Sequence, residues 1–491
     1  MDFIFNKKSI SFFLVVLFIG IPLLGLITSD LNQSPQELSE FQNPKNTYES
    51  TLGAVNILGE SYVNVAGFQE GSIYTHSTLA AGASHTCAIL DDGAVSCWGY
   101  NGLGQIGDGT NSDRTTPTQT VSLGTDRTAV AITAGIHHIC AILDDGSVSC
   151  WGHNPLGSLG DGTTTDKNTP TQTSSLGTDR TAVAIAAGEY HTCAILDDGS
   201  VSCWGSNDYG ALGDGTTTDR NTPTQTSSLG TDRTAVALSA GDYHTCAILD
   251  DGSVSCWGYN VFGQLGDGTT TQRTTPTQTS SLGTDRTAVA IDVGEDYTCA
   301  ILDDGSVSCW GRNYYGALGD GTTTDRNTPA QTSSLGTDRT AVAISAGRYH
   351  TCAVLDDGSV SCWGLGYYGA LGDGSNTDRT VPTQTSSLGT DRTAVAISAG
   401  RYHTCAVIFT EENSGEYYGA ELKCWGYNAR GQLGDGTTTN RNTPTQTSSF
   451  GTDIYQDTIS VGRWHTCAIL DDGSVSCWGY NNYGQIGDGT T

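Results

Sequence analysis

The stretch HTCAILDDGSVSCWG occupies residues 191–205 and recurs letter for letter at 244–258 and 465–479. Five close variants complete a series of eight. The first cysteines of the segments follow one another every 53 residues from Cys87 to Cys405, and Cys467 comes 62 residues later because nine residues are inserted before Cys424. One repetitive domain can therefore take up most of the 491 residues.

Each repeat unit contains four short apolar or β-branched segments, which read AVAISAG, HTCAIL, SVSCWG and TPTQT in typical copies. Turn-forming residues separate them, so each segment is a strand candidate. Four strands in about fifty residues, repeated in tandem, are typical of a β-propeller blade. The sequence therefore predicts an all-β fold, a β-propeller of seven or eight four-stranded blades preceded by one N-terminal hydrophobic helix. Eight hairpins favour eight blades.

The Asp-Asp-Gly at residues 91–93 suits a three-residue hairpin loop whose glycine takes the left-handed conformation. This loop places Cys87 opposite Cys97 at a non-hydrogen-bonded pair, where Cα atoms lie about 4.5 Å apart. Such a spacing is at the short end of what a disulfide accepts. A two-residue Asp-Gly loop would instead place Cys87 opposite Trp98. The turn thus favours a disulfide across the hairpin.

Free thiols and a zinc site that includes His85 are the alternatives to this disulfide. The fifth unit has Tyr297 in the place of the histidine and still keeps both cysteines, which disfavours zinc. An even number of cysteines, with one pair per unit, favours disulfides in an exported chain. The predicted pairs are Cys87–Cys97, Cys140–Cys150, Cys193–Cys203, Cys246–Cys256, Cys299–Cys309, Cys352–Cys362, Cys405–Cys424 and Cys467–Cys477.

The first residues differ from the rest of the chain. After two lysines, residues 10–28 carry no charge and are about long enough to span a bilayer as a helix. Residues 1–28 are therefore a cleaved signal peptide or a retained signal anchor, and both interpretations stay open. Either one exports the propeller to the cell surface or the exterior, and an uncleaved signal places residues 10–28 in the membrane. Residues 29–50 are a flexible polar linker, and residues 51–491 form the propeller.

The composition restricts the classes of partner. A formal net charge of −30 and a pI near 4.3 make the surface repel phosphate backbones. No nucleic-acid partner is therefore expected. The 64 glycines agree with many turns and short strands.

Units of the form GxxHTCAI, DGSVSCWG and NxxGQLGDG resemble the regulator of chromosome condensation repeat family, from about residue 80 to the C-terminus. The resemblance implies a seven-bladed propeller. Its founding member is a nuclear nucleotide-exchange factor, and other members are secreted inhibitory proteins. This chain departs from the pattern with eight hairpins and with a last unit that stops at Thr491 without a TPTQT strand. Either residues 51–80 supply that strand and close the ring, or the chain is truncated.

An enzyme needs a nucleophile, a base and a group that stabilises the transition state, brought together at one unique site. The near-identical units offer no such unique set of residues, so no enzyme activity and no cofactor are expected. The GDG aspartates, such as Asp161 and Asp214, are interpreted as turn formers, with weak calcium binding left open. Seven repeated histidines are interpreted as structural groups that form hydrogen bonds within each blade: His85, His138, His191, His244, His350, His403 and His465.

The units differ from one another at the two residues before each histidine position and at the residues after each CWG. The hairpin register brings these positions together at the open end, so every blade presents them on one face of the disc. Tyrosine, tryptophan and arginine are typical of recognition surfaces. The predicted binding face comprises Glu189, Tyr190, Tyr209, Asp242, Tyr243, Tyr259, Phe262, Glu295, Arg312, Tyr314, Tyr315, Arg348, Tyr349, Tyr367, Tyr368, Arg401, Tyr402, Tyr427, Arg430, Arg463, Trp464, Tyr480 and Tyr483.

The residue two before the histidine position is acidic in three consecutive units and arginine in the next three. We expect an acidic sector beside a basic sector, and a ligand of complementary charge. The function expected from the sequence is an exported, non-catalytic binding propeller that recognises a protein or glycan at the cell surface. The alternatives are a structural surface module, a cell-wall-active enzyme and a nucleotide-exchange regulator.

Overall fold

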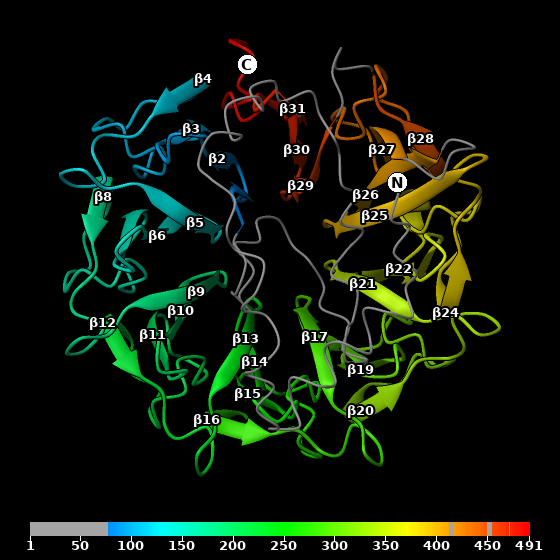
Figure 1. The fold of residues 1–491 in the computed structure, drawn as a ribbon, viewed down its shortest axis with the longest axis horizontal. Coiled ribbons are helices and arrows are strands. Elements are labelled where there is room, and N and C mark those ends of the chain that lie inside the picture. The colour runs from blue at the N-terminus through cyan, green and yellow to red at the C-terminus, as the bar shows by residue number, and fades with distance from the viewer. Residues whose placement is uncertain (1–76, 412–416, 449–453, 471) are drawn as a thin grey trace, which may run out of the picture.

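Eight antiparallel sheets are arranged as blades around a central axis, and the chain passes through them in order (Figure 1). This computed structural model describes residues 77–411, 417–448, 454–470 and 472–491. The prediction of eight blades is confirmed. The expected signal, N-terminal helix and linker lie outside the described residues. No helix in the described part of the chain is long and apolar enough to cross a membrane.

Seven blades begin at the central axis with a short strand that contains alanines, and the eighth begins with a strand that has none. Small alternating side chains fit here because the eight innermost strands crowd together around the axis. These strands are β1 (Leu79–Ala81), β5 (Ala129–Ala134), β9 (Ala182–Ala187), β13 (Ala235–Ala240), β17 (Ala288–Val293), β21 (Ala341–Ala346), β25 (Arg392–Ala399) and β29 (Ile454–Val461).

The two middle strands of each blade carry the cysteines and the tryptophan. The second strands are β2 (His85–Ile89), β6 (His138–Leu143), β10 (His191–Leu196), β14 (His244–Leu249), β18 (Tyr297–Leu302), β22 (His350–Leu355), β26 (His403–Glu411) and β30 (His465–Leu470). The third strands are β3 (Val95–Gly99), β7 (Val148–Gly152), β11 (Val201–Gly205), β15 (Val254–Gly258), β19 (Val307–Gly311), β23 (Val360–Gly364), β27 (Tyr417–Gly426) and β31 (Val475–Gly479).

Outer strands complete the first seven blades, while the eighth sheet has three strands in the described residues. Proline is tolerated in these edge strands because its missing N–H breaks no ladder bond. The outer strands are β4 (Arg114–Gln119), β8 (Lys167–Gln172), β12 (Arg220–Gln225), β16 (Arg273–Gln278), β20 (Arg326–Gln331), β24 (Arg379–Gln384) and β28 (Arg441–Gln446). One 3-10 turn, η1 (Tyr367–Gly369), lies in blade six.

The three-residue turn sets the hairpin register as predicted. In blade three, the Gly199 N–H donates to the Leu196 carbonyl at 2.8 Å, and Gly199 has the expected positive φ of 74°. Cys193 is then paired with Cys203 across β10 and β11. The Cα atoms of these cysteines lie 4.1 Å apart. All eight hairpins carry the predicted disulfide, and none of the described cysteines is free.

Tryptophan from the third strand joins each blade to the preceding one. Trp204 of blade three is fully buried in a cluster with Ile142, Val148 and Leu159 of blade two. Its indole N–H donates to the Ser158 carbonyl at 2.9 Å. Burying a ring of this size contributes about 4–6 kcal/mol at about 25 cal/mol per Å². The hydrophobic core is therefore a series of clusters between neighbouring blades.

The ring closes between the last blade and the first through side chains and loops. The Ala81 N–H donates to the Ser460 hydroxyl at 3.1 Å, and the Gly489 N–H donates to the Thr115 carbonyl at 2.6 Å. The prediction that residues 51–80 supply the outer strand of the last blade is wrong for Leu79 and Ala80. With Ala81 these residues form β1, the innermost strand of blade one, because they continue the alanine-rich pattern of the other innermost strands. Residues 51–76 lie outside the described part.

Candidate functional site

The variable residues meet at the open ends of the hairpins, as the sequence predicted. In blade four, the Tyr259 N–H donates to the Tyr243 carbonyl at 3.0 Å, and in blade eight the Tyr480 N–H donates to the Trp464 carbonyl at 3.0 Å. Equivalent bonds join the two variable segments in each of the other blades. One face of the disc therefore carries all of these segments, and we call it the variable face.

The charged residues of the variable face gather where the central channel opens. A hollow of about 270 Å³ is lined by the last residues of the innermost strands and by the residue two before each histidine position. The order around the ring is an apolar sector, an acidic sector and a basic sector. The residues that form them are Ala83, Ile136, Glu189, Asp242, Glu295, Arg348, Arg401 and Arg463.

The acidic sector holds its negative charge at a high electrostatic cost. Burial, together with the neighbouring Glu189 and Glu295 carboxylates, raises the pKa of Asp242 to about 7. Burial also raises the pKa of Glu295. A cationic group placed between these carboxylates would relieve the repulsion and keep Asp242 ionised.

The two charged sectors contact each other at their boundary. The Arg348 guanidinium forms an ion pair with Glu295, and it lies 5.4 Å from the ring centre of Tyr349. Beside it, Arg312 pairs with Asp296 at 3.0 Å. The acidic sector lies beside the basic sector as expected, and one residue of each neutralises the other across the boundary.

Arg401 and Arg463 complete the basic sector. The Nε atoms of Arg401 and Arg463 are buried and have no hydrogen-bond partner within the described residues. Burial and the neighbouring Arg401 and Arg348 lower the pKa of Arg463. Arg401 lies 5.3 Å from the ring centres of both Tyr402 and Trp464. An anionic group would satisfy both guanidinium groups.

Aromatic rings surround the basic sector in an arc across blades five to eight. The centre of the Tyr402 ring lies 5.9 Å from that of Tyr349 and 6.1 Å from that of Trp464. The arc consists of Tyr314, Tyr315, Tyr349, Tyr367, Tyr368, Tyr402, Tyr427 and Trp464. Two smaller groups contain Tyr209, Tyr243, Tyr259 and Phe262, and Tyr100, Tyr480 and Tyr483.

Two of the predicted arginines lie at the edges of these groups. Arg312 is stacked over the ring of Phe262 at 4.8 Å, and Arg430 over that of Tyr480 at 5.0 Å. Burial, with Glu189 and Asp242 nearby, raises the pKa of Tyr190. The face thus alternates aromatic rings with charged groups, as recognition surfaces do.

The histidines form hydrogen bonds between blades, so the prediction of bonds within each blade is wrong. His191 Nε2 lies 2.9 Å from the Thr245 hydroxyl of the next blade. That hydroxyl donates its proton to the Ala211 carbonyl at 3.0 Å, so we assign the Nε2–H tautomer to His191. Five further pairs repeat this contact, including His465 with Thr86 across the ring closure. Burial lowers the pKa of His191 to about 4, and the ring is neutral at pH 7.

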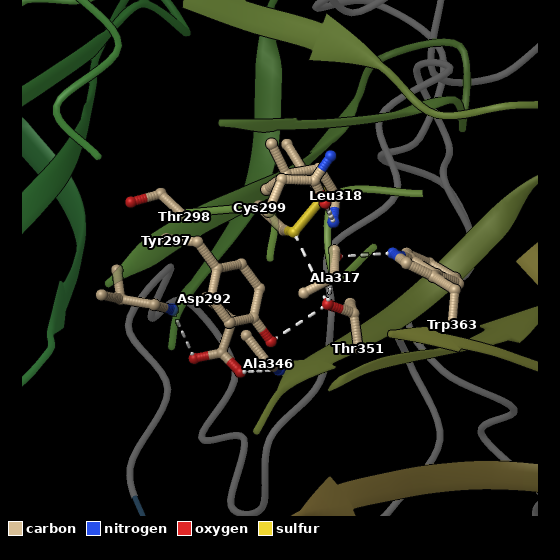
Figure 2. Close-up of a disulfide and its surroundings, with 12 residues drawn as sticks. Asp292, Tyr297, Thr298, Cys299, Ala317, Leu318, Ala346, Thr351 and Trp363 are labelled. Carbon is tan, nitrogen blue, oxygen red and sulfur yellow. Dashed lines mark hydrogen bonds between the residues drawn. A yellow bond between two sulfur atoms is a disulfide. The ribbon is translucent and has the colours of Figure 1, made fainter. Parts of the chain in front are cut away.

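Two blades depart from this pattern for identifiable reasons. His85 faces Ile139 where the other blades offer threonine, and its ring nitrogens have no partner within the described residues. In blade five, Tyr297 replaces the histidine, and its hydroxyl donates to the His350 carbonyl at 2.7 Å and lies 3.1 Å from the Thr351 hydroxyl (Figure 2). The contact between neighbouring blades therefore survives the loss of the histidine in blade five.

A buried carboxylate beside Tyr297 was not expected from the sequence. Asp292 accepts hydrogen bonds from the Ala346 N–H of the next blade at 2.8 Å and from the Val293 N–H at 2.9 Å (Figure 2). Burial raises its pKa to about 6. In several other blades a serine or threonine hydroxyl takes this place, as Thr133 does in accepting from the Ala187 N–H, whereas blades one and three have Ala80 and Ala186 there. The signal in the sequence was the single aspartate at a repeat position that otherwise holds only serine, threonine or alanine.

The GDG aspartates have the turn-forming role that was predicted. Asp214 Oδ1 accepts from the Thr216 N–H at 2.9 Å, while Oδ2 pairs with Arg220 at 2.6 Å. The hydrogen bonds and the Arg220 charge outweigh burial and lower the pKa of Asp214. Across the described residues, no group of three or more histidine, cysteine, aspartate or glutamate side chains is placed to hold a metal ion.

Fold and face together define a disulfide-stapled, eight-bladed propeller with an aromatic and charged face around its channel. A family model described as the RCC1-like domain matches residues 72–406, and models of the regulator of chromosome condensation (RCC1) repeat match residues 424–469 and 457–485. The chain belongs to this RCC1-like family.

Two curated relatives share this repeat sequence. The ultraviolet-B receptor UVR8 of Arabidopsis thaliana is 34% identical over 367 residues, which are 74% of this chain and 80% of the receptor. The human E3 ubiquitin-protein ligase HERC2 is 32% identical over 364 residues, which are 74% of this chain but only 7% of the ligase. A receptor and a ligase share the repeat, so membership of the family does not define the function.

Solved structures agree with the fold. Human WBSCR16 superposes with a TM-score of 0.61 at 21% identity, covering 77% of this chain and all of that one. Yeast RCC1 (Prp20), in its complex with Kap60, gives a TM-score of 0.59 at 18% identity over 86% of this chain and 96% of that one. At these identities the likeness concerns the fold alone.

Proposed function

We propose that this chain is an exported, non-catalytic binding propeller that captures a protein or a glycan through its variable face. The observation that carries the proposal is that the positions at which the repeats differ from one another lie together around the channel mouth. Eight disulfides support export, because such bonds persist in oxidising compartments. Interaction through one face is also a role that a propeller scaffold supports without catalytic groups.

The charges of the channel mouth specify the chemistry of the partner. Glu189 and Asp242 form the part of the acidic sector farther from the Arg348 ion pair, and Arg401 and Arg463 lie beyond that pair on the basic side. The partner therefore carries basic groups toward blades three and four and acidic or sulfated groups toward blades seven and eight. Arginine favours carboxylate or sulfate because its guanidinium binds both oxygens in parallel.

The test is a pull-down with the purified, disulfide-bonded propeller against cell-wall glycans and surface proteins. Simultaneous alanine replacement of Tyr314, Tyr315, Tyr367 and Tyr368 should abolish capture and leave the melting temperature unchanged. These tyrosines lie on surface loops, with Tyr314 68% and Tyr367 57% exposed, so their loss removes little of the core. Capture that survives the replacement would favour the alternative, a structural surface module without a specific ligand.

A further inference from the structure

In seven blades, an asparagine side chain holds the loop after the third strand by hydrogen bonds, and blade six lacks this asparagine. Asn313 of blade five is an example. Its Nδ2 donates to the Thr322 and Thr324 carbonyls at 3.1 Å, and its Oδ1 accepts from the Leu318 N–H at 3.0 Å. The asparagines at this position are Asn101, Asn154, Asn207, Asn260, Asn313, Asn428 and Asn481. Gly366 stands there in blade six.

The glycine lets the loop take another course. A Cβ atom on Gly366 would lie 2.1 Å from the Thr377 carbonyl oxygen, so the backbone of the far side of the loop has moved into the place of the asparagine side chain. Next to it, Tyr368 has a φ of 66°. The other described non-glycine residues with positive φ are all aspartates. A positive φ strains the backbone of a tyrosine, so the surrounding structure must hold Tyr368 in this conformation. Such strained residues occur most often at functional sites.

This rearranged loop borders a hollow on the variable face, which we call the blade-six groove. Its volume is about 610 Å³, and five tyrosines, Leu365 and residues 376–378 line it. The tyrosines are Tyr315, Tyr349, Tyr367, Tyr368 and Tyr402. Small-molecule sites have volumes of roughly 300–1,000 Å³ and combine aromatic walls with a few polar groups. The groove has the size and the lining of such a site.

The tyrosine rings in the groove are set at different angles to one another. Tyr368 meets Tyr402 nearly at right angles, at 78° and 5.8 Å between ring centres, and it lies 4.1 Å from Tyr367. Asp378 also lines the groove, where its Oδ1 accepts from the Gly366 N–H at 2.9 Å and the residue remains exposed. Asn376 beside it supplies an amide that both donates and accepts.

We infer that the blade-six groove binds a neutral pyranose ring of a glycan, an inference that rests on the proposed binding function. The apolar C–H face of a sugar ring is complementary to the negative face of a tyrosine ring. Its hydroxyls suit the phenol, amide and carboxylate groups at the rim. An anionic sugar is less suitable here, because Asp378 would repel it, whereas the arginines of the channel mouth suit acidic groups.

The experiment is a titration of the disulfide-bonded chain with neutral hexasaccharides of glucose, N-acetylglucosamine, mannose and galactose, followed by saturation-transfer NMR and calorimetry. At least one sugar should bind with a Kd of about 1 mM or tighter, as expected for a single-ring site. Tyr367→Ala should weaken that binding about tenfold, since exposed aromatic anchors dominate small interfaces. Val261→Ala at the same repeat position in blade four, 55% exposed, is the matched control and should leave it unchanged.

Gly366→Asn is the sharper variant, because it removes no aromatic ring. Restoring the asparagine should draw the loop into the form of the other seven blades, close the groove and abolish sugar binding. The inference fails if no sugar binds at about 10 mM, or if Tyr367→Ala leaves the binding unchanged. If sugars do not bind while a charge-dependent partner is still captured through the channel mouth, the inference fails but the proposed function stands.

Discussion

Acidification from pH 7 to pH 5 should destabilise the propeller through its seven buried histidines. Burial lowers their pKa values from 6.5 to between about 3 and about 4. Below pH 6.5 the unfolded chain therefore takes up a proton at each histidine that the folded chain does not bind. The stability is fully present above pH 6.5 and is lost as the pH falls toward 4. Linkage gives a loss of about 2 kcal/mol for each histidine between pH 7 and pH 5.

Four carboxyl groups whose pKa is raised by burial act in the opposite direction: Asp242, Asp292, Glu295 and Asp296. Burial raises the pKa of Asp242 to about 7 and that of Asp292 to about 6, so the folded state takes up their protons first. Acidification stabilises the fold through these two groups, by about 1–2 kcal/mol each over the same interval. The seven histidines outnumber these four carboxyl groups, so we expect the net effect of acid to be destabilising.

The chain itself supplies the variants that isolate one histidine. Tyr297 takes the place of the histidine in blade five and keeps the contact with the next blade. His191→Tyr should therefore fold and lose about 2 kcal/mol less than the wild type between pH 7 and pH 5, whereas Tyr297→His should lose about 2 kcal/mol more. Urea unfolding followed by tryptophan fluorescence at both pH values measures this difference. Equal pH dependence in all three proteins would refute the role of the histidines.

Three further outcomes are expected. Thr245→Val keeps the shape but leaves His191 Nε2 without its acceptor, so the free energy of unfolding at pH 7 should fall by about 1–3 kcal/mol, as chemical denaturation can measure. The oxidised chain should weigh about 16 Da less than its fully reduced form, since each of eight disulfides removes two hydrogens. Peptide mapping should find crosslinks only between cysteines of one hairpin, such as Cys193 with Cys203. Crosslinks between hairpins would contradict the register. Association with the partner should slow as the salt concentration rises from about 10 to 150 mM, where the Debye length falls to about 8 Å. Binding should also weaken when lysine replaces the arginines of the channel mouth. If neither change affected binding, the charge sectors would have no role in recognition. Those arginines are Arg348, Arg401 and Arg463.

The parts of the fold that depend on local chemistry were predictable from the sequence. A glycine in a three-residue turn fixes the hairpin register, and the register fixes both the pairing of Cys193 with Cys203 and the convergence of the variable residues. The number of blades followed from counting hairpins, because each hairpin contributes one sheet.

Contacts between blades were less predictable, because they join residues more than fifty positions apart. His191 and Thr245 lie 54 residues apart, and the strand pattern places neither side chain relative to the next blade. The ion pair of Glu295 with Arg348 was missed for the same reason. Gly366 could have been noticed as the one glycine in a column of asparagines, but its effect depends on a backbone rearrangement that a sequence does not display.

Every disulfide lies within one blade, so the covalent staples divide the chain into units that respond separately to mechanical force. Cysteines in seven of the eight hairpins are ten residues apart, in repeats of 53 residues. When a blade is pulled out of the ring, the residues outside its disulfide extend, whereas the ten-residue segment closed by the disulfide cannot extend. At about 3.6 Å per residue, each such blade yields roughly 150 Å of length instead of the roughly 190 Å of an unstapled repeat. Stretching one oxidised molecule should therefore give short, nearly equal steps that lengthen when the thiols are reduced.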